Sequence, residues 1–539
     1  MTDVHRLGTR AVLARVPSAS VDAVRTLLEA EPLPGQLEVA AGGASVTVRF
    51  ATLAHADAGR SSLARLQAPA GQPSSGGLVT IDVVYDGEDL DDVAAATGRS
   101  VEAVVRAHAG ASWHVAFVGF APGFAYLRAD RDGPVVPRRS SPRARVPAGA
   151  VALAGSYSAV YPRSSPGGWQ LVGRTDARLW SLERDEPTLL PAGTRVDFRA
   201  VRAQARAAEA QAAPLPRVDA AERPPHALVV RSAGAQTLVE DLGRAGLAHL
   251  GIARSGAADR GALRQANRLV GNVVEAAAIE HVGGGLRIEA AGEHVLAVTG
   301  AAAPLVVRSP RGDRSPAPAA PFALRDGDAL EVAAVRGGLR VVVGVRGGVD
   351  VPAVLGSRST DVLSGLGPPP VRAGDVLPVG RATAQAVGAP EPLAGAGAVA
   401  ARAADGEDGE GDVVLDVVLG PDDAWIPDAA ATLAAATWIV TPQSNRVGVR
   451  LDGPPIARRD GELESQALVP GAIQVPPSGL PVVFLADHPA TGGYPVVAVV
   501  ADDHLDALAQ LAPGTAVRLR PASATAPGAP GPTASQETA

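Results

Sequence analysis

Apolar residues recur at helical spacing in only a few short stretches of this chain. The spacing predicts a helix over 20–30, which Pro32 ends. Two further short helices are expected on either side of Gly98, one over 89–96 and one beginning at Ser100, a residue type that caps helices. A fourth is expected from Asp259 to Gly271, with one apolar face. Helices are therefore a minor part of the predicted fold.

Alternation of apolar and polar residues is more frequent than helical spacing. Within 45–50, apolar residues alternate with Ser45, Thr47 and Arg49, which predicts a half-buried strand. Another strand is expected over 78–85. From Trp113 to Phe198, short β-branched runs separated by Pro/Gly turns predict a barrel or sandwich. The same pattern of short β-branched runs and Pro/Gly turns returns from Leu228 onward, so the expected class is β-rich α+β.

Changes in composition divide the chain into compact stretches and connections. Ala/Arg-rich and then Pro-rich residues indicate one linker, and a Gly/Ala/acid-rich run indicates another. We expect an N-terminal α+β subdomain over 1–82, a barrel over 83–203, a linker over 204–226, a first lobe over 227–388, a flexible acidic connection over 389–411, a second lobe over 412–520 and a disordered tail over 521–539.

Composition restricts the classes of function. The chain has 539 residues, of which 46% are hydrophobic and 19% charged, enough apolar surface for several cores. Its net charge of −7 gives no global basic footprint for nucleic acid or an anionic membrane. No long apolar run predicts a membrane span, and residues 1–15 do not resemble a signal peptide, so we expect a cytoplasmic protein.

Missing residue types exclude further chemistry. The sequence contains no Cys, which excludes thiolate nucleophiles, disulfides and thiolate metal sites. It also contains no Lys, which excludes a Walker A lysine, a Schiff-base lysine and a biotin-bearing lysine. The ten His form no metal-binding motif, so no metal site is expected. All basic side chains that could hold an anion are therefore Arg or His.

The stretch 117–127, FVGFAPGFAYL, is the most unusual local motif. It carries three of the seven Phe in the chain, and Gly119, Pro122 and Gly123 prevent a regular strand or helix throughout. Glycine lets backbone amides approach a ligand, and aromatic rings can line a pocket. A packed aromatic turn within a barrel is the alternative interpretation.

Two segments downstream carry candidate anion-binding groups. Residues 137–149 concentrate four Arg, among them Arg138 and Arg143, whose guanidinium groups suit carboxylate or phosphate. Residues 161–170 include Ser165, Gly168 and Trp169 in a turn that could form an anion-binding nest. A solvated basic loop and an ordered corner around Trp169 are the respective alternatives.

These three segments, in this order, resemble subunit 1 of the allophanate-hydrolase-type family, which includes the B component of 5-oxoprolinase and the Kip kinase inhibitor. The resemblance covers about residues 1–203 and implies an N-terminal α+β subdomain followed by a cyclophilin-like β-barrel. It implies substrate or nucleotide binding by Gly119, Phe120, Pro122, Gly123, Phe124, Tyr126, Arg138, Arg143, Ser165, Gly168 and Trp169.

The second half, about 227–520, independently resembles subunit 2 of the same family, which includes the C component of 5-oxoprolinase and the carboxyltransferase part of urea carboxylase. The resemblance implies a two-lobed, cyclophilin-like, carboxyltransferase-type domain. Asn445 departs from the family pattern, where Asp is common. The matching motifs imply catalytic Arg346, Arg358, Asp361 and Arg446, and binding by Gly347, Gly348, Ser357, Ser359, Gln443, Gln474, Thr491, Gly492, Gly493 and Tyr494.

The resemblance implies three functions. The first is ATP-dependent hydrolysis of L-5-oxoproline to L-glutamate with a separate A component of 5-oxoprolinase, in which Arg346, Arg358 and Arg446 would contact ATP. The second is carboxyl transfer from biotin on a carrier supplied in trans, because this chain has no lysine to carry biotin. The third is regulatory binding to a sensor histidine kinase. A homo-oligomer is possible for each.

Overall fold

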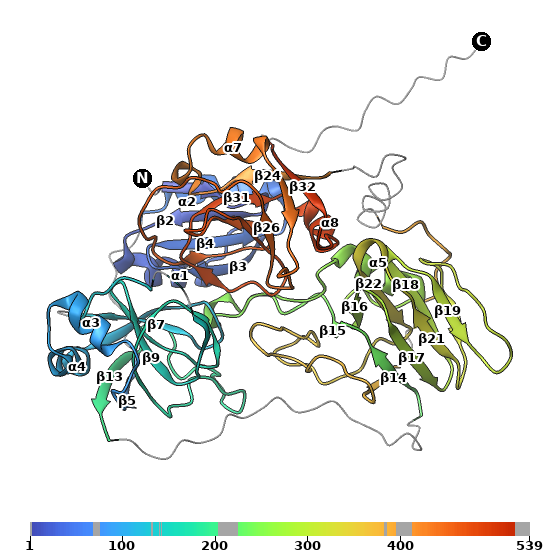
Figure 1. The fold of residues 1–539 in the computed structure, drawn as a ribbon, viewed down its shortest axis with the longest axis horizontal. Helices are drawn as coiled ribbons and strands as arrows, with labels where there is room; N and C mark the ends of the chain where they lie inside the picture. The colour runs from blue at the N-terminus through green and yellow to red at the C-terminus, as the bar shows by residue number, and fades with distance from the viewer. Residues whose placement is uncertain are drawn as a thin grey trace, which may run out of the picture.

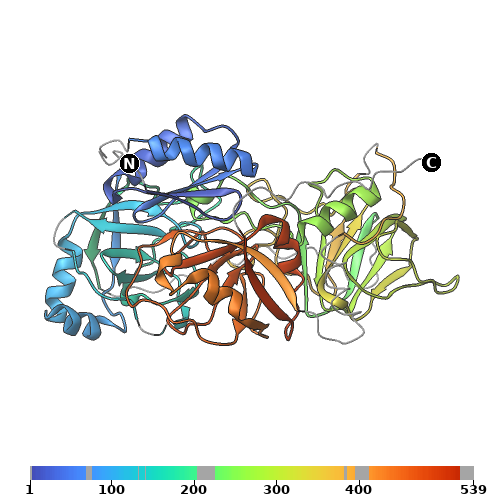
Figure 2. The ribbon, with the colours of Figure 1, turned by 90° about the horizontal axis from the view of Figure 1, so that it is seen from above.

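The computed structural model describes residues 3–67, 76–130, 133–139, 141, 143–202, 225–381, 385–394 and 412–522. They form four β-rich units, which we call the N-terminal unit, the first barrel, the sandwich lobe and the C-terminal barrel. The C-terminal barrel lies between the sandwich lobe and the two N-terminal units (Figures 1 and 2). The predicted linker, acidic connection and tail lie largely outside the described residues. The β-rich α+β class is confirmed.

The N-terminal unit is an antiparallel four-stranded sheet with helices packed against it. Its strand order is β1-β2-β4-β3. The predicted helix is present as α1, with Val21, Val24 and Leu28 buried. The elements are β1 (Asp3–Arg6), β2 (Ala11–Arg15), η1 (Ser18–Ser20), α1 (Val21–Ala30), β3 (Gln36–Ala41), β4 (Ser45–Phe50) and α2 (Leu53–Arg65).

Strand β4 differs from its prediction. Its apolar face is buried as expected, but Ser45 and Thr47 on the polar face are also buried, with 5% and 3% of their surfaces exposed. Residues 467–470 of the C-terminal barrel lie against this polar face, together with Ala253 and Arg254 of the sandwich lobe. The strand is therefore covered on both sides by parts of the chain that are distant in sequence.

The first barrel is a seven-stranded sheet of order β12-β9-β10-β7-β6-β13-β5. A bridge between Val84 and Arg174 brings its two edges together and nearly closes it. The elements are β5 (Leu78–Val83), α3 (Leu90–Thr97), α4 (Val101–Gly110), β6 (Trp113–Val118), β7 (Ala125–Ala129), β8 (Arg143–Val146), β9 (Ala150–Ala154), β10 (Tyr157–Val160), β11 (Ser165–Gly167), β12 (Gln170–Arg174) and β13 (Arg195–Ala200).

Strand β5 corrects the predicted boundary at residue 82. The sequence prediction places 78–82 in the N-terminal subdomain, but β5 pairs in parallel with β13 along its whole length. The boundary therefore lies before Leu78. A strand that pairs with a partner more than a hundred residues away leaves no local signal of which sheet it joins.

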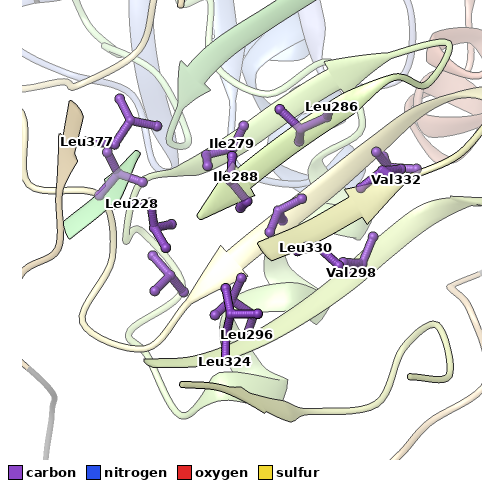
Figure 3. Packing of buried hydrophobic residues seen from close by; sticks show 14 of the residues in the cluster. Leu228, Ile279, Leu286, Ile288, Leu296, Val298, Leu324, Leu330, Val332 and Leu377 are labelled. Carbon is purple, nitrogen blue, oxygen red and sulfur yellow. The ribbon is translucent and has the colours of Figure 1, made fainter. Parts of the chain in front are cut away.

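The sandwich lobe consists of two five-stranded sheets of orders β19-β21-β17-β14-β23 and β15-β16-β22-β18-β20. Leu228, Ile279, Leu296 and Leu330 are among the buried residues of its core (Figure 3). The elements are β14 (Ala227–Ala233), β15 (Gln236–Glu240), η2 (Ala248–Leu250), α5 (Arg260–Val270), β16 (Ala278–Val282), β17 (Leu286–Ala291), β18 (His294–Ala302), β19 (Leu305–Arg308), β20 (Phe322–Leu324), β21 (Ala329–Val332), β22 (Arg336–Val345) and β23 (Val376–Pro378).

The C-terminal barrel is closed, with strand order β24-β31-β28-β29-β26-β25-β32. No helix in the described residues is long and apolar enough to cross a membrane. The elements are β24 (Val413–Leu419), η3 (Asp423–Trp425), α7 (Ala429–Ala435), β25 (Thr437–Val440), β26 (Gly448–Asp452), β27 (Gln466–Ala467), β28 (Ala472–Gln474), β29 (Val482–Phe484), β30 (Thr491–Gly492), β31 (Val496–Val500), η4 (Asp502–His504), α8 (Leu505–Ala509) and β32 (Ala516–Pro521).

The N-terminal unit packs directly on the C-terminal barrel, although the two are the most distant units in sequence. Leu7 and Ala11 form one buried cluster with Phe484 and Val499. Beside this cluster, the guanidinium of Arg15 donates to the buried carboxylate of Asp422 at 2.8 Å. The first and last units are thereby held together by an apolar patch and an ion pair.

A buried ion cluster joins the sandwich lobe to the C-terminal barrel. Arg446 of the barrel, 1% exposed, donates to Asp487 at 2.9 and 3.0 Å. It also donates to Glu280 of the sandwich lobe and lies 3.3 Å from Glu240. Arg340 adds a second guanidinium, 3.6 Å from Glu280. We call these five residues the ion cluster.

Three carboxylates in the ion cluster face only two guanidinium groups. Both carboxylate oxygens of Glu240 are buried without a hydrogen-bond partner in the described structure. Burial raises the pKa of Glu240 well above its usual range and outweighs the opposing effect of Arg446. Glu240 therefore holds a proton in the folded protein at pH values where an exposed glutamate is ionised.

The Glu240→Gln variant tests this protonation. A glutamate whose pKa is raised on folding stabilises the fold fully below its unfolded pKa, and the contribution is lost as pH rises through the folded pKa. Glutamine avoids that loss, so the free energy of unfolding should favour the variant increasingly above about pH 4.5, by up to about 1.4 kcal/mol per pH unit.

Urea unfolding of both proteins between pH 5 and 9 measures the difference. The matched control is Glu293→Gln, which changes an exposed glutamate of the same lobe. A stability difference between Glu240→Gln and the unchanged protein that stays constant across this range would contradict the protonated Glu240.

Candidate functional site

The aromatic turn of the first barrel joins β6 to β7 in a tight, irregular conformation. Phe120 has a φ of 61°, a left-handed value that is rare for a residue with a side chain. The amide of Gly119 donates to the carbonyl of Phe124 at 3.0 Å, which closes the loop. Phe124 packs edge-to-face on Tyr126 and Trp169. The turn is thus a packed aromatic corner, as the alternative interpretation predicted.

The outer side of this corner forms an interface with the second half of the chain. The strained conformation directs the Phe120 amide to the side-chain oxygen of Thr491, at 2.9 Å. The hydroxyl oxygens of Tyr126 and Thr491 are 3.3 Å apart, and Ser465 donates to Tyr126 at 3.4 Å. Groups of the aromatic turn, of the Thr491 motif and of Ser465 therefore meet at one point.

Close backbone approach explains two of the glycines at this interface. A Cβ on Gly119 would lie 2.5 Å from the Thr491 side chain. A Cβ on Gly251 of the sandwich lobe would lie 2.4 Å from the carbonyl oxygen of Ala121. The amide of Gly123 also donates to the carbonyl of Leu250 at 3.2 Å. The turn consequently touches both the C-terminal barrel and the sandwich lobe.

Arg138 extends the same interface. Its backbone amide donates to Glu462 at 3.1 Å, and its guanidinium lies at hydrogen-bond distance, 3.4 Å, from the carbonyl of Gly493 and from Ser465. A Cβ on Gly493 would lie 2.3 Å from that guanidinium. Nearby, Gln474 donates to the carbonyl of Tyr494 at 2.8 Å. This side of the interface is therefore lined by polar groups from both halves.

We call this interface the turn junction. It brings together most of the predicted aromatic and glycine-rich residues and adds groups that the sequence analysis did not select. The predicted members are Gly119, Phe120, Phe124, Tyr126, Arg138, Gln474, Thr491, Gly493 and Tyr494, and the added members are Gly251, Glu462 and Ser465.

Glu464, also absent from the prediction, neutralises charge beside the turn junction. Its carboxylate accepts hydrogen bonds from Tyr157 at 2.7 Å and from Arg128 at 3.1 Å. Burial and the neighbouring Glu464 raise the pKa of Tyr157, so the phenol remains a donor. A carboxylate in a loop 307 residues from its tyrosine partner gives no sequence signal for this contact.

Arg143 and Ser165 serve the interior of the first barrel instead. Arg143 donates to both carboxylate oxygens of Asp89, at 2.7 and 2.9 Å. Burial of Asp89 raises its pKa, but its hydrogen bonds from Arg143 and the Leu171 amide prevail, and the pKa is lowered overall. Ser165 pairs with Val146 in the β11–β8 ribbon. The Arg-rich loop therefore binds an internal carboxylate.

The run 357–361 also holds an internal anion. Ser357 and Ser359 each donate to Asp241 at 2.6 Å, and the Arg358 amide donates to its other oxygen at 2.6 Å. Asp361 accepts hydrogen bonds from the amides of residues 363 and 364. The predicted anion-binding chemistry is present, but its ligand is Asp241 of the same chain.

The three arginines predicted to contact ATP do not form one site. Arg446 is enclosed within the ion cluster, and its burial contradicts direct contact with a nucleotide. The Arg358 guanidinium donates to Val351 and Asp350, whereas Arg346 donates to the carbonyls of Val270 and Gln385 at the end of α5 and its connection. The three guanidinium groups have different partners, and for Arg346 and Arg358 the contact with ATP stays a prediction.

Three other predicted residues, Gly347, Gly348 and Gln443, lie in turns. The Gly347 amide donates to Asn272 at 2.8 Å, and Gly348 follows it at the end of β22. Gln443 is exposed between β25 and β26. Asn445 accepts hydrogen bonds from the amides of Val447 and Gly448, at 2.8 and 3.3 Å. Its side-chain oxygen provides the acceptor that an aspartate would provide in this turn.

Both halves of the chain match models of one family. The model described as carboxyltransferase domain, subdomain C and D, matches residues 2–190. The model described as carboxyltransferase domain, subdomain A and B, matches residues 250–521, which is half of the chain. The turn junction joins these two matched regions.

Curated relatives divide in the same way. The chain is 35% identical over 292 residues to the C component of 5-oxoprolinase from Escherichia coli, 53% of this chain and 87% of that protein. It is 44% identical over 124 residues to the B component of 5-oxoprolinase from Bacillus subtilis, 22% of this chain and 52% of that protein. It is also 31% identical over 323 residues to urea amidolyase of Lachancea kluyveri, 57% of this chain but 17% of that protein.

A solved structure, that of TTHA0988, is similar along nearly the whole chain. It has a TM-score of 0.79 and 32% identity, and the match covers 95% of this chain and 100% of that one. The chain therefore belongs to the carboxyltransferase-domain family and unites in one polypeptide the regions similar to the B and C components of 5-oxoprolinase.

Proposed function

We propose that this protein is the fused B and C component of an ATP-dependent 5-oxoprolinase that works with a separate A component. The observation that carries the proposal is the turn junction, where the aromatic turn of the B-like half and the Thr491 motif of the C-like half bond to each other. Regions similar to two separate proteins, the B and C components of 5-oxoprolinase, are here joined in one chain.

The proposed reaction needs activation of an unreactive amide. A five-membered lactam resists attack by water, and transfer of a phosphoryl group from ATP to the amide oxygen makes its carbon a better electrophile. Hydrogen bonds from the Phe120 amide and the Arg138 guanidinium cross the junction, so they hold the two halves in a fixed relative position beside a polar substrate. The A component is proposed to complete the site, since Arg346, Arg358 and Arg446 are engaged within the chain.

Coupled turnover tests the proposed function. Co-expression with the A component of a 5-oxoprolinase should yield ATP-dependent release of L-glutamate from L-5-oxoproline, measured by a glutamate-specific assay. The reaction should stop when ATP, the A component or this chain is omitted. Absence of turnover with folded, co-purified proteins would contradict the proposal.

The Thr491→Val variant tests the role of the turn junction. Valine keeps the shape but leaves the part-buried Phe120 amide without its acceptor, which should lower the free energy of unfolding by about 1–3 kcal/mol. We expect coupled turnover to fall at least about fivefold, in line with the loss of one such hydrogen bond.

Thr437→Val, at an exposed threonine of the same barrel, is the matched control and should change neither quantity. Unchanged turnover in a folded Thr491→Val variant would show that the turn junction does not contribute to activity.

Carboxyl transfer is the second candidate, favoured by the carboxyltransferase models and the similarity to urea amidolyase. With no lysine in the chain, biotin would have to arrive on a separate carrier. Transfer of labelled carboxylate from a carboxybiotin carrier to urea, with no glutamate release in the coupled assay, would favour this function over the first.

A further inference from the structure

A small, partly open cavity lies beside the turn junction, where three units of the chain meet. Its walls come from β3 and β4 of the N-terminal unit, from residues 248–254 of the sandwich lobe and from residues 467–470 and 488–490 of the C-terminal barrel. Its volume of about 30 Å³ is room for two or three water-sized groups. That is the size of a carboxylate group.

The segment 248–254 connects this cavity to the turn junction. On one side, Leu250 accepts the Gly123 amide and Gly251 touches the turn. On the other side, Ala248, Ile252 and Arg254 line the cavity. The cavity and the turn junction are therefore two faces of the same short segment.

The wall of the cavity is positively charged. Arg49 and Arg254 line it, and Arg260 lies near both. In the described structure, no carboxylate lies within 4.0 Å of a guanidinium nitrogen of these three arginines. Arg254 and Arg260 donate to the carbonyls of Leu242 and Ser255, which leaves each guanidinium without a direct ion pair in the described structure. Three cations crowded in this way favour a bound anion.

The pKa values of two of these arginines reflect the crowding. Burial, together with Arg254 and Arg49, lowers the pKa of Arg260 to about 9. Burial and the charges of Arg49 and Arg264 also lower the pKa of Arg254. His488, on the cavity wall, is neutral because burial lowers its pKa to about 4, so the positive charge comes from the arginines.

The acidic side chains around the cavity accept hydrogen bonds from other groups of the chain. Glu38, which lines it, accepts the amides of Gly246 and Ala248 at 3.1 Å each. Asp506 accepts the amides of Arg260 and Gly261, and Asp487 is held by Arg446 and Ser255. Asp241, which also acts on Arg254, holds the two serines described above.

A buried hydroxyl supplies an independent observation. Thr47 lines the cavity with 3% of its surface exposed, and its side-chain oxygen has no hydrogen-bond partner in the described structure. Leaving a buried hydroxyl unpaired is costly. A hydroxyl and two guanidinium groups facing one small space form a donor set for an oxyanion.

We propose that this cavity is a binding site for a planar carboxylate-type oxyanion, held by Arg49, Arg254 and the Thr47 hydroxyl. Resting on the proposed function, the inference identifies the ligand as the carboxylate of L-5-oxoproline. Bicarbonate has the same chemistry and is the second source that the experiment separates. The cavity fits the carboxylate and not the whole molecule, so the ring would lie outside it.

Equilibrium binding to the full chain, with no A component present, tests the proposal. The probes are L-5-oxoproline, bicarbonate and 2-pyrrolidone, which is the same ring without the carboxylate. L-5-oxoproline should bind, and Arg49→Gln and Arg254→Gln should each weaken its binding by about 10- to 100-fold. Arg60→Gln, at an exposed arginine of α2, is the matched control and should leave the affinity unchanged.

Thr47→Val gives a second measurement if either arginine variant fails to fold. Removing an unpaired buried hydroxyl should leave the thermal stability of the free protein unchanged or increased, while it weakens L-5-oxoproline binding. If Thr47 had only a structural role, its replacement would not weaken binding while stability stayed the same or rose.

Three results would overturn the inference: no binding of L-5-oxoproline or bicarbonate, equal binding of 2-pyrrolidone, or affinities unaffected by Arg49→Gln and Arg254→Gln. Arginine-dependent binding of bicarbonate alone would support the site and overturn the L-5-oxoproline assignment. Failure of the proposed function is distinguishable, because arginine-dependent binding would persist without coupled turnover. Conversely, if neither Arg49→Gln nor Arg254→Gln changed coupled turnover, the assignment of the cavity as a carboxylate site would be overturned and the proposed function would stand.

Discussion

Arg446 and the carboxylates that surround it are the constraint on which the arrangement of the second half depends. One guanidinium from the C-terminal barrel reaches Glu240 and Glu280 of the sandwich lobe while it also holds Asp487 of its own barrel. A buried charge without partners costs several kcal/mol, so the two lobes cannot shift far without breaking these contacts. Such a cluster specifies a relative position more than it adds stability.

The consequences of this cluster extend to both candidate sites. Asp487 accepts the Ser255 hydroxyl at 2.6 Å, and the Gly256 carbonyl accepts Arg446 at 2.7 Å. These contacts fix the end of the segment whose preceding residues touch the aromatic turn and line the cavity. A charge network in the interior thereby positions a segment that meets all three other units.

The family, the β-rich class and several local elements could be read from the sequence. The α5 helix begins with Asp259 accepting the Ala262 amide and ends at Gly271 in a left-handed conformation, both of which local rules predict. The aromatic turn is recognisable because Gly, Pro and Phe are unusual together in a strand-rich region. Such signals are local, so sequence reasoning captures them.

The wrong predictions have one physical origin. The burial of a side chain and its hydrogen-bond partners depend on residues that are distant in sequence. Ser357 and Ser359 do bind an anion, as their residue types predict. Nothing in the sequence shows that this anion is the Asp241 carboxylate of the same chain. Arg49 and Thr47 look solvent-exposed in an alternating strand, although a distant barrel covers them. Arginine content alone cannot distinguish a structural guanidinium from one that is open to a ligand.

Hydrogen exchange on the full chain tests most directly whether the ion cluster positions the junction. In Arg446→Lys, or in Ser255→Ala if that variant does not fold, amide exchange should accelerate in residues 247–255 and also across the interface in residues 119–124. The Glu293→Gln protein should match the unchanged chain in both segments. Faster exchange confined to the immediate neighbours of Arg446, with the aromatic turn unaffected, would contradict the account.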